Sequence, residues 1–376
     1  MNICILSYMY PGKHNASDFA FVKQLVDELA AQGNNCYVLA PFNILHYKKL
    51  SESEEQYSVG RGSVTVYRPG YFSFSNFHIG RFSFSSWSHQ KAVNKAFRRL
   101  KIKPDVIYGH FWSSAFEGFD YAKAHDIPLF VASGESEIKF RRTERTAAFC
   151  DYVSGVICVS SKNRDESVIL GLTSCEKCEV FPNAINASLF KKLDKQACRA
   201  KLNLPNDAFI VAFVGWFNDR KGSKRVSEAL KRIDGSPVCS IFVGKGTEEP
   251  DCDSILFKGA LPHDEVPTYL NAADVFVLPT LHEGCCNAIV EAMACGLPVI
   301  SSNLPFNWDV LNERNSIMID PNNIEEIKNA IVLLRDDETK RKTMAGEALR
   351  MVQELSIDVR AQRILEFIEL KYNINL

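Results

Sequence analysis

Two glutamates, Glu283 and Glu291, stand eight residues apart in the stretch LHEGCCNAIVEAMACGLPVI, and carboxylates in such a pattern can accept hydrogen bonds from a polar ligand. Residues 274–280 (DVFVLPT) have the composition of a buried strand, and a helical pattern starts near residue 287. We therefore expect Glu283 on the turn at the carboxyl end of the strand and Glu291 about two turns into the helix.

The spacing of these carboxylates limits the ligand that both could hold. A helix rises about 1.5 Å per residue, so the eight-residue separation corresponds to at most roughly 12 Å, the length of an extended ligand rather than of one sugar ring. The helix start lies between them, and its free amides and positive dipole end favour a phosphate. Gly284 would let the backbone approach that phosphate closely. A sugar joined to a nucleoside diphosphate fits this pattern, with one carboxylate on the hydroxyl groups at each end.

The same two residues also allow a purely structural interpretation. Glu283 would then be an acidic residue at a helix start, where the dipole favours it, and Glu291 a solvated residue on the helix surface. The spacing alone does not separate this interpretation from a ligand site, so the elements around the glutamates have to be considered.

The length and composition of the chain indicate a folded protein of two domains. It has 376 residues, of which 46% are hydrophobic and 24% are charged, and its net charge is −1. This charge gives no bulk attraction to nucleic acid or to a membrane. The start NICILSYMY lacks a basic region and a cleavage site, and no apolar stretch approaches the roughly 18 residues of a spanning helix. We expect a cytoplasmic protein.

The 12 cysteines indicate reduced thiols. Cys175 and Cys178 form a single CEKC motif, and a structural zinc site would need a second Cys or His pair at matching spacing. A metal or redox role for this pair stays open, but cytosolic thiols account better for the scattered pattern.

Short apolar runs alternate with amphipathic helical segments twice along the chain, which predicts two α/β layers with parallel sheets. The second series starts near Ala208, and an irregular link, VFPNAINASLF, precedes it. We predict domains at 1–185 and 186–355, with a helix at 356–376 that could return to the first domain. Such halves bind ligands at the carboxyl ends of their strands. Neither a G-x-G-x-x-G motif after the first strand nor a P-loop is present.

Several longer blocks stand in a recognisable order: PDVIYGHFW, PNAINASLF, VGWFNDRKG, FKG, ADVFVLPT and EGCCNAIVEAMACGLPV. By these blocks the chain resembles the retaining glycosyltransferases of family 4 over nearly its whole length. The resemblance implies the α/β GT-B fold, in which two Rossmann-like, doubly wound domains face a central cleft.

The resemblance also implies roles for single residues. His110 and Glu283 would be catalytic and would contact the donor sugar, while Glu291 would hold the ribose hydroxyls. Lys221 would neutralise the leaving diphosphate, which gains charge in an oxocarbenium-like transition state. The remaining predicted contacts are Arg220, Gly284, Asn287 and Ala288 on the phosphate side and Gly244 and Leu261 on the base side.

The chain departs from the family pattern at three places. Trp216 stands where the family has an arginine, and we expect Arg220 to supply the second cation. Cys286 replaces a glycine, which would narrow the donor pocket. Residues 11–21 (PGKHNASDFAF) replace an early glycine pair of the first domain.

A D-x-D motif at residues 251–253 would suit the metal site of GT-A transferases. It lies in the polar stretch TEEPDCDS, which indicates a loop, and in the wrong half of the chain for that fold. We expect a metal-independent enzyme with no cofactor besides its nucleotide-sugar donor.

Residues 71–103 could face the acceptor. Residues 71–87 are aromatic and serine-rich, and basic residues follow that meet no acid in the sequence: Lys91, Lys95, Arg98, Arg99, Lys101 and Lys103. A basic helix beside exposed aromatics could lie on an anionic membrane surface. Core strands followed by a solvated helix face would explain the segment equally well. Nucleic-acid binding is disfavoured, since no recognisable module surrounds the basic run.

Together these patterns predict a transferase that moves a hexose-type sugar from a UDP- or GDP-sugar to a glycan or lipid-linked glycan acceptor. By the resemblance the reaction would proceed with retention and serve bacterial surface polysaccharide synthesis, at the inner face of the membrane. Two alternatives stay open: a GT-B-fold sugar-nucleotide epimerase or hydrolase-like relative, and a non-catalytic transferase that acts as a partner subunit.

Overall fold

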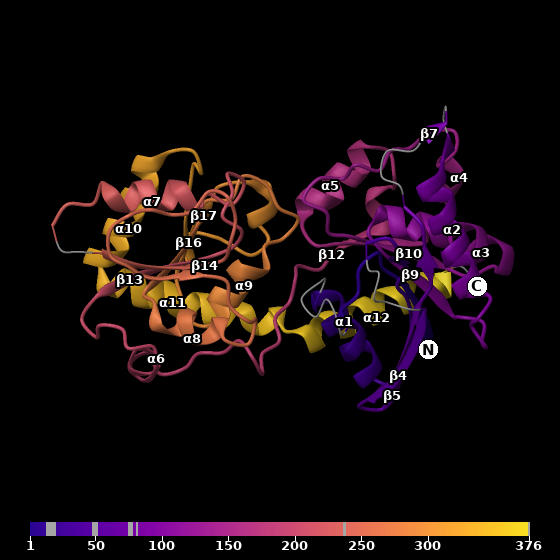
Figure 1. Cartoon of the computed structure of the whole chain (residues 1–376), viewed down its shortest axis with the longest axis horizontal. Helices are drawn as coiled ribbons and strands as arrows, with labels where there is room; N and C mark the ends of the chain where they lie inside the picture. The colour runs from indigo at the N-terminus through magenta and orange to yellow at the C-terminus, as the bar shows by residue number, and fades with distance from the viewer. Residues whose placement is uncertain (13–19, 47–51, 74–77, 80–81, 236–237, 375–376) are drawn as a thin grey trace. The chain divides into compact units, whose positions relative to one another are not determined.

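The computed structural model describes residues 1–12, 20–46, 52–73, 78–79, 82–235 and 238–374. Two compact units make up the chain: the first is Met1–Phe181 with Arg360–Leu376, and the second is Pro182–Val359. The first unit is therefore discontinuous in sequence, because the last helix belongs to it. Figure 1 shows both units and labels many of their helices and strands.

An eight-stranded sheet organises the first unit, in the order β12-β11-β10-β9-β1-β2-β5-β4. Neighbouring strands are parallel except for β4 and β5, which pair antiparallel. The strands are β1 (Asn2–Leu6), β2 (Asn35–Leu39), β4 (Ser53–Val59), β5 (Gly62–Arg68), β9 (Val106–His110), β10 (Leu129–Ser133), β11 (Gly155–Cys158) and β12 (Cys178–Val180). Two small ribbons pair β3 (Phe42–Asn43) with β6 (Gly70–Tyr71) and β7 (His78–Ile79) with β8 (Phe82–Ser83).

Burial explains which segments form this sheet. Every residue of β9, β10 and β11 is buried, as expected of parallel strands covered on both faces. Half-buried and exposed residues alternate along β4, which lies at the edge of the sheet and carries polar side chains on its outer face. The apolar runs therefore specify the centre of the sheet, and the alternating run specifies its edge.

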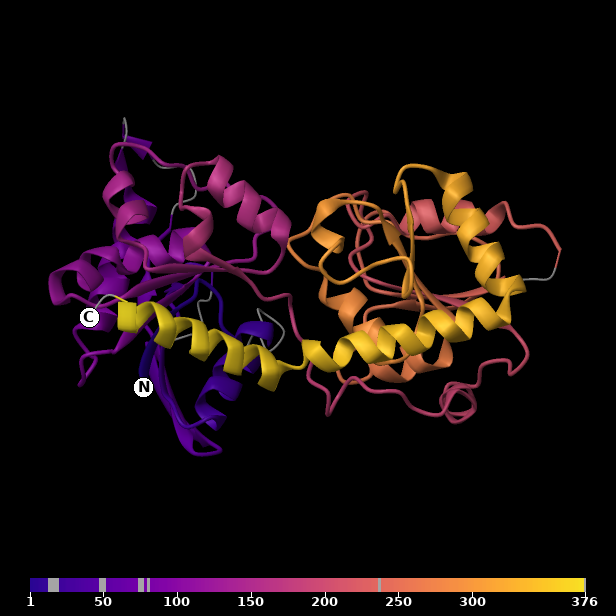
Figure 2. The ribbon, with the colours of Figure 1, turned by 180° about the vertical axis from the view of Figure 1, so that it is seen from behind.

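Helices complete the first unit: α1 (Ala20–Ala31), α2 (Phe84–Phe97), α3 (Trp112–His125), α4 (Ala147–Tyr152), α5 (Ser161–Ile169), the 3₁₀ turn η1 (Cys175–Lys177) and α12 (Ile357–Ile374). Trp112 and Phe149 are buried in the core on one side of the sheet. Figure 2 shows the yellow helix α12 at the end of the chain. The ring of its Phe367 packs edge-on against Phe130 of β10 and Phe181, with centroids 6.0 and 6.2 Å away. The final helix thus supplies part of the first unit's core.

A six-stranded parallel sheet organises the second unit, in the order β15-β14-β13-β16-β17-β18. Its strands are β13 (Phe209–Val214), β14 (Val238–Val243), β15 (Ile255–Gly259), β16 (Val275–Leu278), β17 (Val299–Ser302) and β18 (Ser316–Ile319). Its helices are α6 (Lys195–Lys201), α7 (Ser223–Lys231), α8 (Val266–Ala272), α9 (Asn287–Ala294), α10 (Ile324–Asp336) and α11 (Glu338–Val352), with 3₁₀ turns η2 (Pro305–Asn307) and η3 (Gln353–Leu355). Helices α7 and α10 lie on one face of this sheet and α8 and α9 on the other (Figure 1).

Each sheet has a point where the strand order reverses. The chain moves outward from β13 to β14 and β15, and then returns to the other side of β13 with β16. In the first unit the corresponding pair is β1 and β9. Loops that leave such strands at their carboxyl ends diverge, which creates the usual ligand crevice of a doubly wound sheet. The predicted fold of two Rossmann-like units is confirmed.

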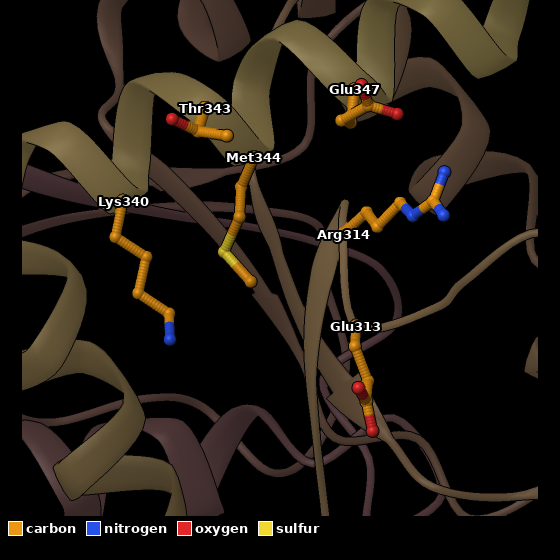
Figure 3. Close-up of a pocket in the computed structure, with 6 residues that line it drawn as sticks. All are labelled: Glu313, Arg314, Lys340, Thr343, Met344 and Glu347. Carbon is orange, nitrogen blue, oxygen red and sulfur yellow. The ribbon is translucent and has the colours of Figure 1, made fainter.

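An open hollow in the second unit lies at the opposite end of the sheet. It is lined by Glu313 and Arg314, which precede β18, and by Lys340, Thr343, Met344 and Glu347 of α11 (Figure 3). Its charges are mixed, and it lies at the amino end of β18. The hollow is therefore separate from the residues predicted to do chemistry, which follow the carboxyl ends of the strands.

Candidate active site

Three charged side chains meet at the carboxyl ends of β13 and β16. One oxygen of Glu283, Oε1, accepts hydrogen bonds from Arg220 Nη1 and Lys221 Nζ, both at 2.6 Å. Thr280 donates its hydroxyl to the same oxygen at 2.9 Å. Lys221 and Glu283 are buried, and Arg220 is about one-third exposed. The structure thus brings together the three residues that the sequence placed on the sugar and diphosphate side.

The cluster keeps its charges despite burial. Burial alone would raise the pKa of Glu283, but the charges of Lys221 and Arg220 outweigh it and hold that pKa below its usual value. Burial also opposes the charged form of Lys221, whereas Cys286 and Glu283 raise the pKa of its ammonium group. With one carboxylate and two cations, the cluster carries one net positive charge, which suits an anionic ligand.

The loops that hold this cluster are fixed by their own backbone. The Asn218 side chain accepts from the amide of Lys221 at 3.0 Å, and the amide of Leu281 donates to the carbonyl of Arg220 at 2.8 Å. Gly222 ends the loop with φ +80°, and a Cβ there would meet the Pro279 carbonyl oxygen at 2.9 Å. The loop after β13 is therefore tied directly to the turn after β16.

Glu291 lies in α9, which starts at Asn287, so this glutamate is about one turn into the helix rather than the predicted two. The helix starts where the sequence placed it, and the predicted distance was too long because only four residues separate Asn287 from Glu291. Gly284 is buried in the turn after β16, and Ala288 belongs to the first helical turn.

Asn183, from the link before the second unit's first helix, holds this turn. Its side-chain amide donates to the carbonyl of Cys285 at 2.9 Å and to Oδ1 of Asn287 at 2.7 Å. The amino end of α9, with its positive dipole end, is thereby fixed beside the Lys221 cluster.

The carboxylate of Glu291 has a partner that the sequence did not indicate. His263, in the loop that follows β15, lies with Nε2 2.9 Å from Oε1 of Glu291. The hydrogen bond to Glu291 raises the pKa of His263, although burial opposes this. Glu291 is buried and His263 is about half exposed, so the pair lies at the rim of the site.

The two residues predicted on the base side lie at the carboxyl ends of β14 and β15. Gly244 directly follows β14 with φ +154°, and a Cβ there would fall 1.9 Å from the carbonyl oxygen of Gly215. A glycine is therefore required by the close approach of two backbones. Leu261 is half-buried two residues beyond Gly259, the end of β15.

Two of the departures from the family pattern lie in this site. The Sγ of Cys286 accepts from Lys221 Nζ at 3.5 Å, so this thiol contacts the buried ammonium group. Burial raises the pKa of Cys286, which keeps the thiol neutral. Trp216 is 55% exposed, and Lys245 Nζ lies 5.5 Å from the centre of its ring. The third departure, residues 11–21, lies largely outside the described residues.

His110 ends β9 in the first unit and is buried. The next residue, Phe111, has φ +77°, a conformation that costs a non-glycine residue of order 1–3 kcal/mol. Helix α3 starts directly after it, and Glu135 Oε1 accepts from the amide of Trp112 at 3.0 Å. Glu135 thus supports the turn that directly follows His110.

The surroundings of His110 keep it neutral. Its ring centroid lies 4.5 Å from that of Phe111 and 5.4 Å from that of Phe21. Burial, helped by the positive charge of Arg360 on α12, lowers the pKa of His110 to about 3. At neutral pH the imidazole is therefore available as a hydrogen-bonding group and not as a cation.

The predicted family is tested by two family models that match successive parts of the chain. The model of "Glycosyltransferase Family 4" matches residues 20–189, and that of "Glycosyl transferases group 1" matches residues 194–351. The chain belongs to glycosyltransferase family 4. The first match covers the part that carries His110, and the second covers Lys221, Glu283 and Glu291.

Curated proteins similar to this transferase include TuaC of Bacillus subtilis (strain 168), assigned as a glycosyltransferase of teichuronic acid biosynthesis. The two are 26% identical over 94% of each chain. An Escherichia coli UDP-Gal:α-D-GlcNAc-diphosphoundecaprenol α-1,3-galactosyltransferase is 27% identical over 70% of this chain and 75% of its own.

Solved structures similar to the transferase share its fold. Sucrose-phosphate synthase from Thermosynechococcus elongatus superposes with a TM-score of 0.78, at 20% identity over 99% of both chains. HepE of Anabaena, in complex with UDP, gives a TM-score of 0.72, at 18% identity over 98% of this chain and 100% of its own.

The aromatic and basic segment of the transferase lies partly outside the described residues, at 74–77 and 80–81. In the described part, Trp87 on α2 is 43% exposed, and Lys91 Nζ lies 4.0 Å from its ring centre. The basic run meets no acid in the sequence, but two of its members pair with one in the structure. Lys95 and Arg99 bind Glu52 at 2.7 and 3.0 Å, a contact between residues more than 40 apart that sequence proximity could not reveal.

The acidic and cysteine motifs of the transferase make structural contacts. Asp251 of the D-x-D motif binds Lys231 at 2.9 Å and the hydroxyl of Ser227 at 3.0 Å. Cys175 and Cys178 are free thiols. Across the described residues, no group of three or more His, Cys, Asp or Glu side chains is arranged to hold a metal ion. Among the described helices, none is both long and apolar enough to cross a membrane.

Sequence reasoning did not identify His263, Thr280 and Asn183 as parts of the site. Thr280 ends the quoted DVFVLPT run, where a hydroxyl three residues before Glu283 was a usable signal. Asn183 lies in the quoted link PNAINASLF. His263 has no comparable signal, because its contact joins residues that are 28 positions apart.

Proposed function

We propose that this family 4 transferase moves a sugar from a UDP- or GDP-sugar to a glycan or lipid-linked glycan acceptor, with retention of the anomeric configuration. The observation that carries the proposal is the Glu283–Lys221–Arg220 cluster beside the amino end of α9. A net positive cluster next to a helix dipole suits the diphosphate of a nucleotide sugar. HepE, a protein of the same fold, has been solved with UDP and with UDP-glucose.

Each residue of the cluster has a separate role in the proposed reaction. Lys221 and Arg220 stabilise the charge that grows on the leaving nucleoside diphosphate when the glycosidic bond breaks. They also hold Oε1 of Glu283, so that Oε2 is the oxygen proposed to accept from the sugar hydroxyls. Neutral His110 is proposed to hydrogen-bond the same sugar. These cations would supply the charge stabilisation without a metal ion, so activity in the presence of EDTA is expected.

The proposed acceptor class rests on the relatives and on α2. TuaC is assigned to teichuronic acid biosynthesis, and the name of the E. coli galactosyltransferase gives a diphosphoundecaprenol acceptor. We therefore propose a role in bacterial surface polysaccharide synthesis at the inner face of the membrane. Exposed Trp87 with Lys91 would contact anionic lipid. We expect the protein to sediment with phosphatidylglycerol vesicles but not with phosphatidylcholine vesicles, and we expect Trp87→Ser to lose this sedimentation. Equal sedimentation with both kinds of vesicle would contradict the proposed membrane contact.

A single variant separates the proposed chemistry from simple nucleotide binding. Glu283→Gln keeps the shape of the side chain but raises the net charge of the cluster by one. We expect it to bind UDP or GDP at least as tightly as the wild type, and to lose transfer by about 10²–10³-fold. Thermal shift with a panel of nucleoside diphosphates, followed by an acceptor-dependent release assay, measures both quantities.

Matched variants complete this test. Lys221→Gln should weaken diphosphate binding and transfer together, while Lys231→Gln, a surface lysine of α7 that pairs with Glu228 and Asp251, should change neither. Transfer by Glu283→Gln at the wild-type rate would refute the catalytic assignment. No binding of any nucleoside diphosphate by the wild type would refute the donor site itself.

A further inference from the structure

His263 and Glu291 form a hydrogen-bonded pair, and His263 has no role in the function proposed above. Nε2 of His263 lies 2.9 Å from Oε1 of Glu291. In the part of the chain that the structure describes, His263 is the only residue hydrogen-bonded to this carboxylate. The side chain of Glu291 is 11% exposed and that of His263 is 48% exposed. A buried carboxylate is therefore held from one side by an imidazole that reaches out to solvent.

The imidazole is itself fixed in place. Its ring centroid lies 5.0 Å from that of Phe190, a buried residue of the segment before α6. His263 precedes α8, and Glu291 lies on α9, so the contact joins a loop and a helix of the same unit. The hydrogen bond to Glu291 and the charge of Asp264 raise the pKa of His263, while burial opposes this shift. The hydrogen bond and the charge of Asp264 both favour the protonated imidazole, which donates more strongly from Nε2 to the carboxylate.

We propose that His263 is a positioning residue of the nucleotide-sugar site: it holds one oxygen of Glu291 so that the other accepts from the ribose hydroxyls of the donor. The proposal rests on the proposed function, because it takes the nucleoside diphosphate as the ligand. It adds a residue that the family resemblance did not assign, and it predicts how the site distinguishes ribonucleotides from deoxyribonucleotides.

The parallel with Glu283 supports this role. In both glutamates Oε1 is held by nitrogen donors of basic side chains, Lys221 and Arg220 in one case and His263 in the other. A carboxylate that is free to rotate must lose rotamer freedom when a ligand binds, whereas a held carboxylate has already lost it.

The experiment compares ribose-containing and deoxyribose-containing ligands. The tightest ligand among UDP, GDP and ADP, and its 2′-deoxy and 3′-deoxy analogues, are titrated calorimetrically into the full chain. The variants are His263→Ala, His263→Gln, Glu291→Gln and the double variant His263→Ala/Glu291→Gln. His125→Ala, at an exposed histidine near the end of α3, is the matched control. The side-chain amide of His263→Gln can still donate to Glu291.

We expect the wild type to prefer the ribonucleotide by about 10- to 100-fold, the usual range for a hydrogen bond to a charged group. His263→Ala should lose most of this preference by weakening ribonucleotide binding, while deoxyribonucleotide binding changes little. His263→Gln should recover part of the preference for the ribonucleotide. The double variant should bind the ribonucleotide no more weakly than Glu291→Gln does. A loss of stability alone would instead weaken all three ligands by the same factor.

The outcomes separate this inference from the proposed function. Suppose that the wild type prefers ribonucleotides, that Glu291→Gln loses this preference and that His263→Ala retains it. The positioning role of His263 is then wrong, while the proposed donor site stands. If Glu291→Gln retains the preference, Glu291 does not read the ribose and the inference is equally wrong. If the wild type binds none of the nucleoside diphosphates, the proposed function fails and the inference fails with it.

Discussion

His110 and His263 are both histidines near the carboxyl ends of strands, yet their surroundings move their pKa values in opposite directions. His110 is enclosed by aromatic rings and faces the positive charge of Arg360, so its pKa falls to about 3. His263 donates to a carboxylate at the rim of the site, so its pKa rises. The residue type alone therefore does not tell in which direction the surroundings move the pKa of a histidine.

A stability measurement can test the state of His110. Its pKa is lower in the folded chain than in the unfolded chain, so the unfolded chain binds the extra proton and folding loses stability as the pH falls below about 6.5. Between pH 6.5 and pH 5 this amounts to about 2 kcal/mol. In thermal unfolding, His110→Asn should show a smaller decrease of the first unit's midpoint over this range. An equal decrease in both proteins would mean that His110 is not held neutral.

Gly244 tests whether the base-side loop depends on backbone contact. A Cβ at this position would fall 1.9 Å from the Gly215 carbonyl oxygen, so Gly244→Ala must displace the segment that leads to Lys221. We expect a loss of about 1–3 kcal/mol in unfolding free energy and weaker nucleoside diphosphate binding. Gly346→Ala is the control, because it lies within α11 with open space around it and should stabilise by about 0.5–1 kcal/mol. Wild-type affinity in Gly244→Ala would contradict this role.

Residues that act through local spacing were predictable, and those that act through distant contacts were not. Glu283 lies in the turn after β16 and Glu291 on α9, so their place in one strand–turn–helix unit follows from the local sequence pattern. The pairing of Glu52 with Lys95 depends on how β4 and α2 come together in the first unit, which no local pattern specifies. His263 is the same kind of case within the second unit.

At the scale of elements, the buried parallel strands were the most predictable part of the fold. Strand β16 lies within the apolar run predicted at 274–280, and β13 starts one residue after Ala208, where the second series was expected. The antiparallel pair β4 and β5 was not predicted. Strand β4 alternates exposed and half-buried residues, and no local pattern in the sequence specifies that it pairs with β5.

The docking of α12 can be tested with two substitutions on the same helix. Phe367 is buried against Phe130 and Phe181, so Phe367→Ala should cost about 3–5 kcal/mol of the first unit's unfolding free energy. Leu370 is 58% exposed, and Leu370→Ala should change the same unfolding free energy by less than about 0.5 kcal/mol. Chemical denaturation with a probe in the first unit measures both. Equal effects of the two substitutions would mean that α12 does not complete this core.

At the scale of the whole molecule, the two units differ in how the chain builds them. The second unit is one continuous segment, Pro182–Val359, whereas the first needs residues from both ends of the sequence. A helix at the end of the chain was predictable from its amphipathic pattern. The face that it covers was not, because its partners Phe130 and Phe181 lie roughly 190 to 240 residues away in sequence.

Removing the end of the chain should therefore destabilise the first unit more than the second. A chain that ends at Val359 loses the part of α12 that packs on the first unit. Under limited proteolysis we expect rapid digestion of Met1–Phe181 and survival of a fragment that spans Pro182–Val359. That fragment should retain nucleoside diphosphate binding, since Lys221, Glu283 and Glu291 all lie within it. Equal protease resistance of both parts would show that the first unit is complete without α12.

The place of α12 in the first unit also bears on how the protein is made. Translation proceeds from the amino terminus, and domains usually fold in that order as they leave the ribosome. Here the segment that covers Phe130 and Phe181 is synthesised last. The second unit can be complete while the first still exposes an apolar face, so the nascent chain has an interval in which chaperones or aggregation compete for that face. The amino-terminal half, although synthesised first, therefore cannot complete its core until the second unit has also been synthesised.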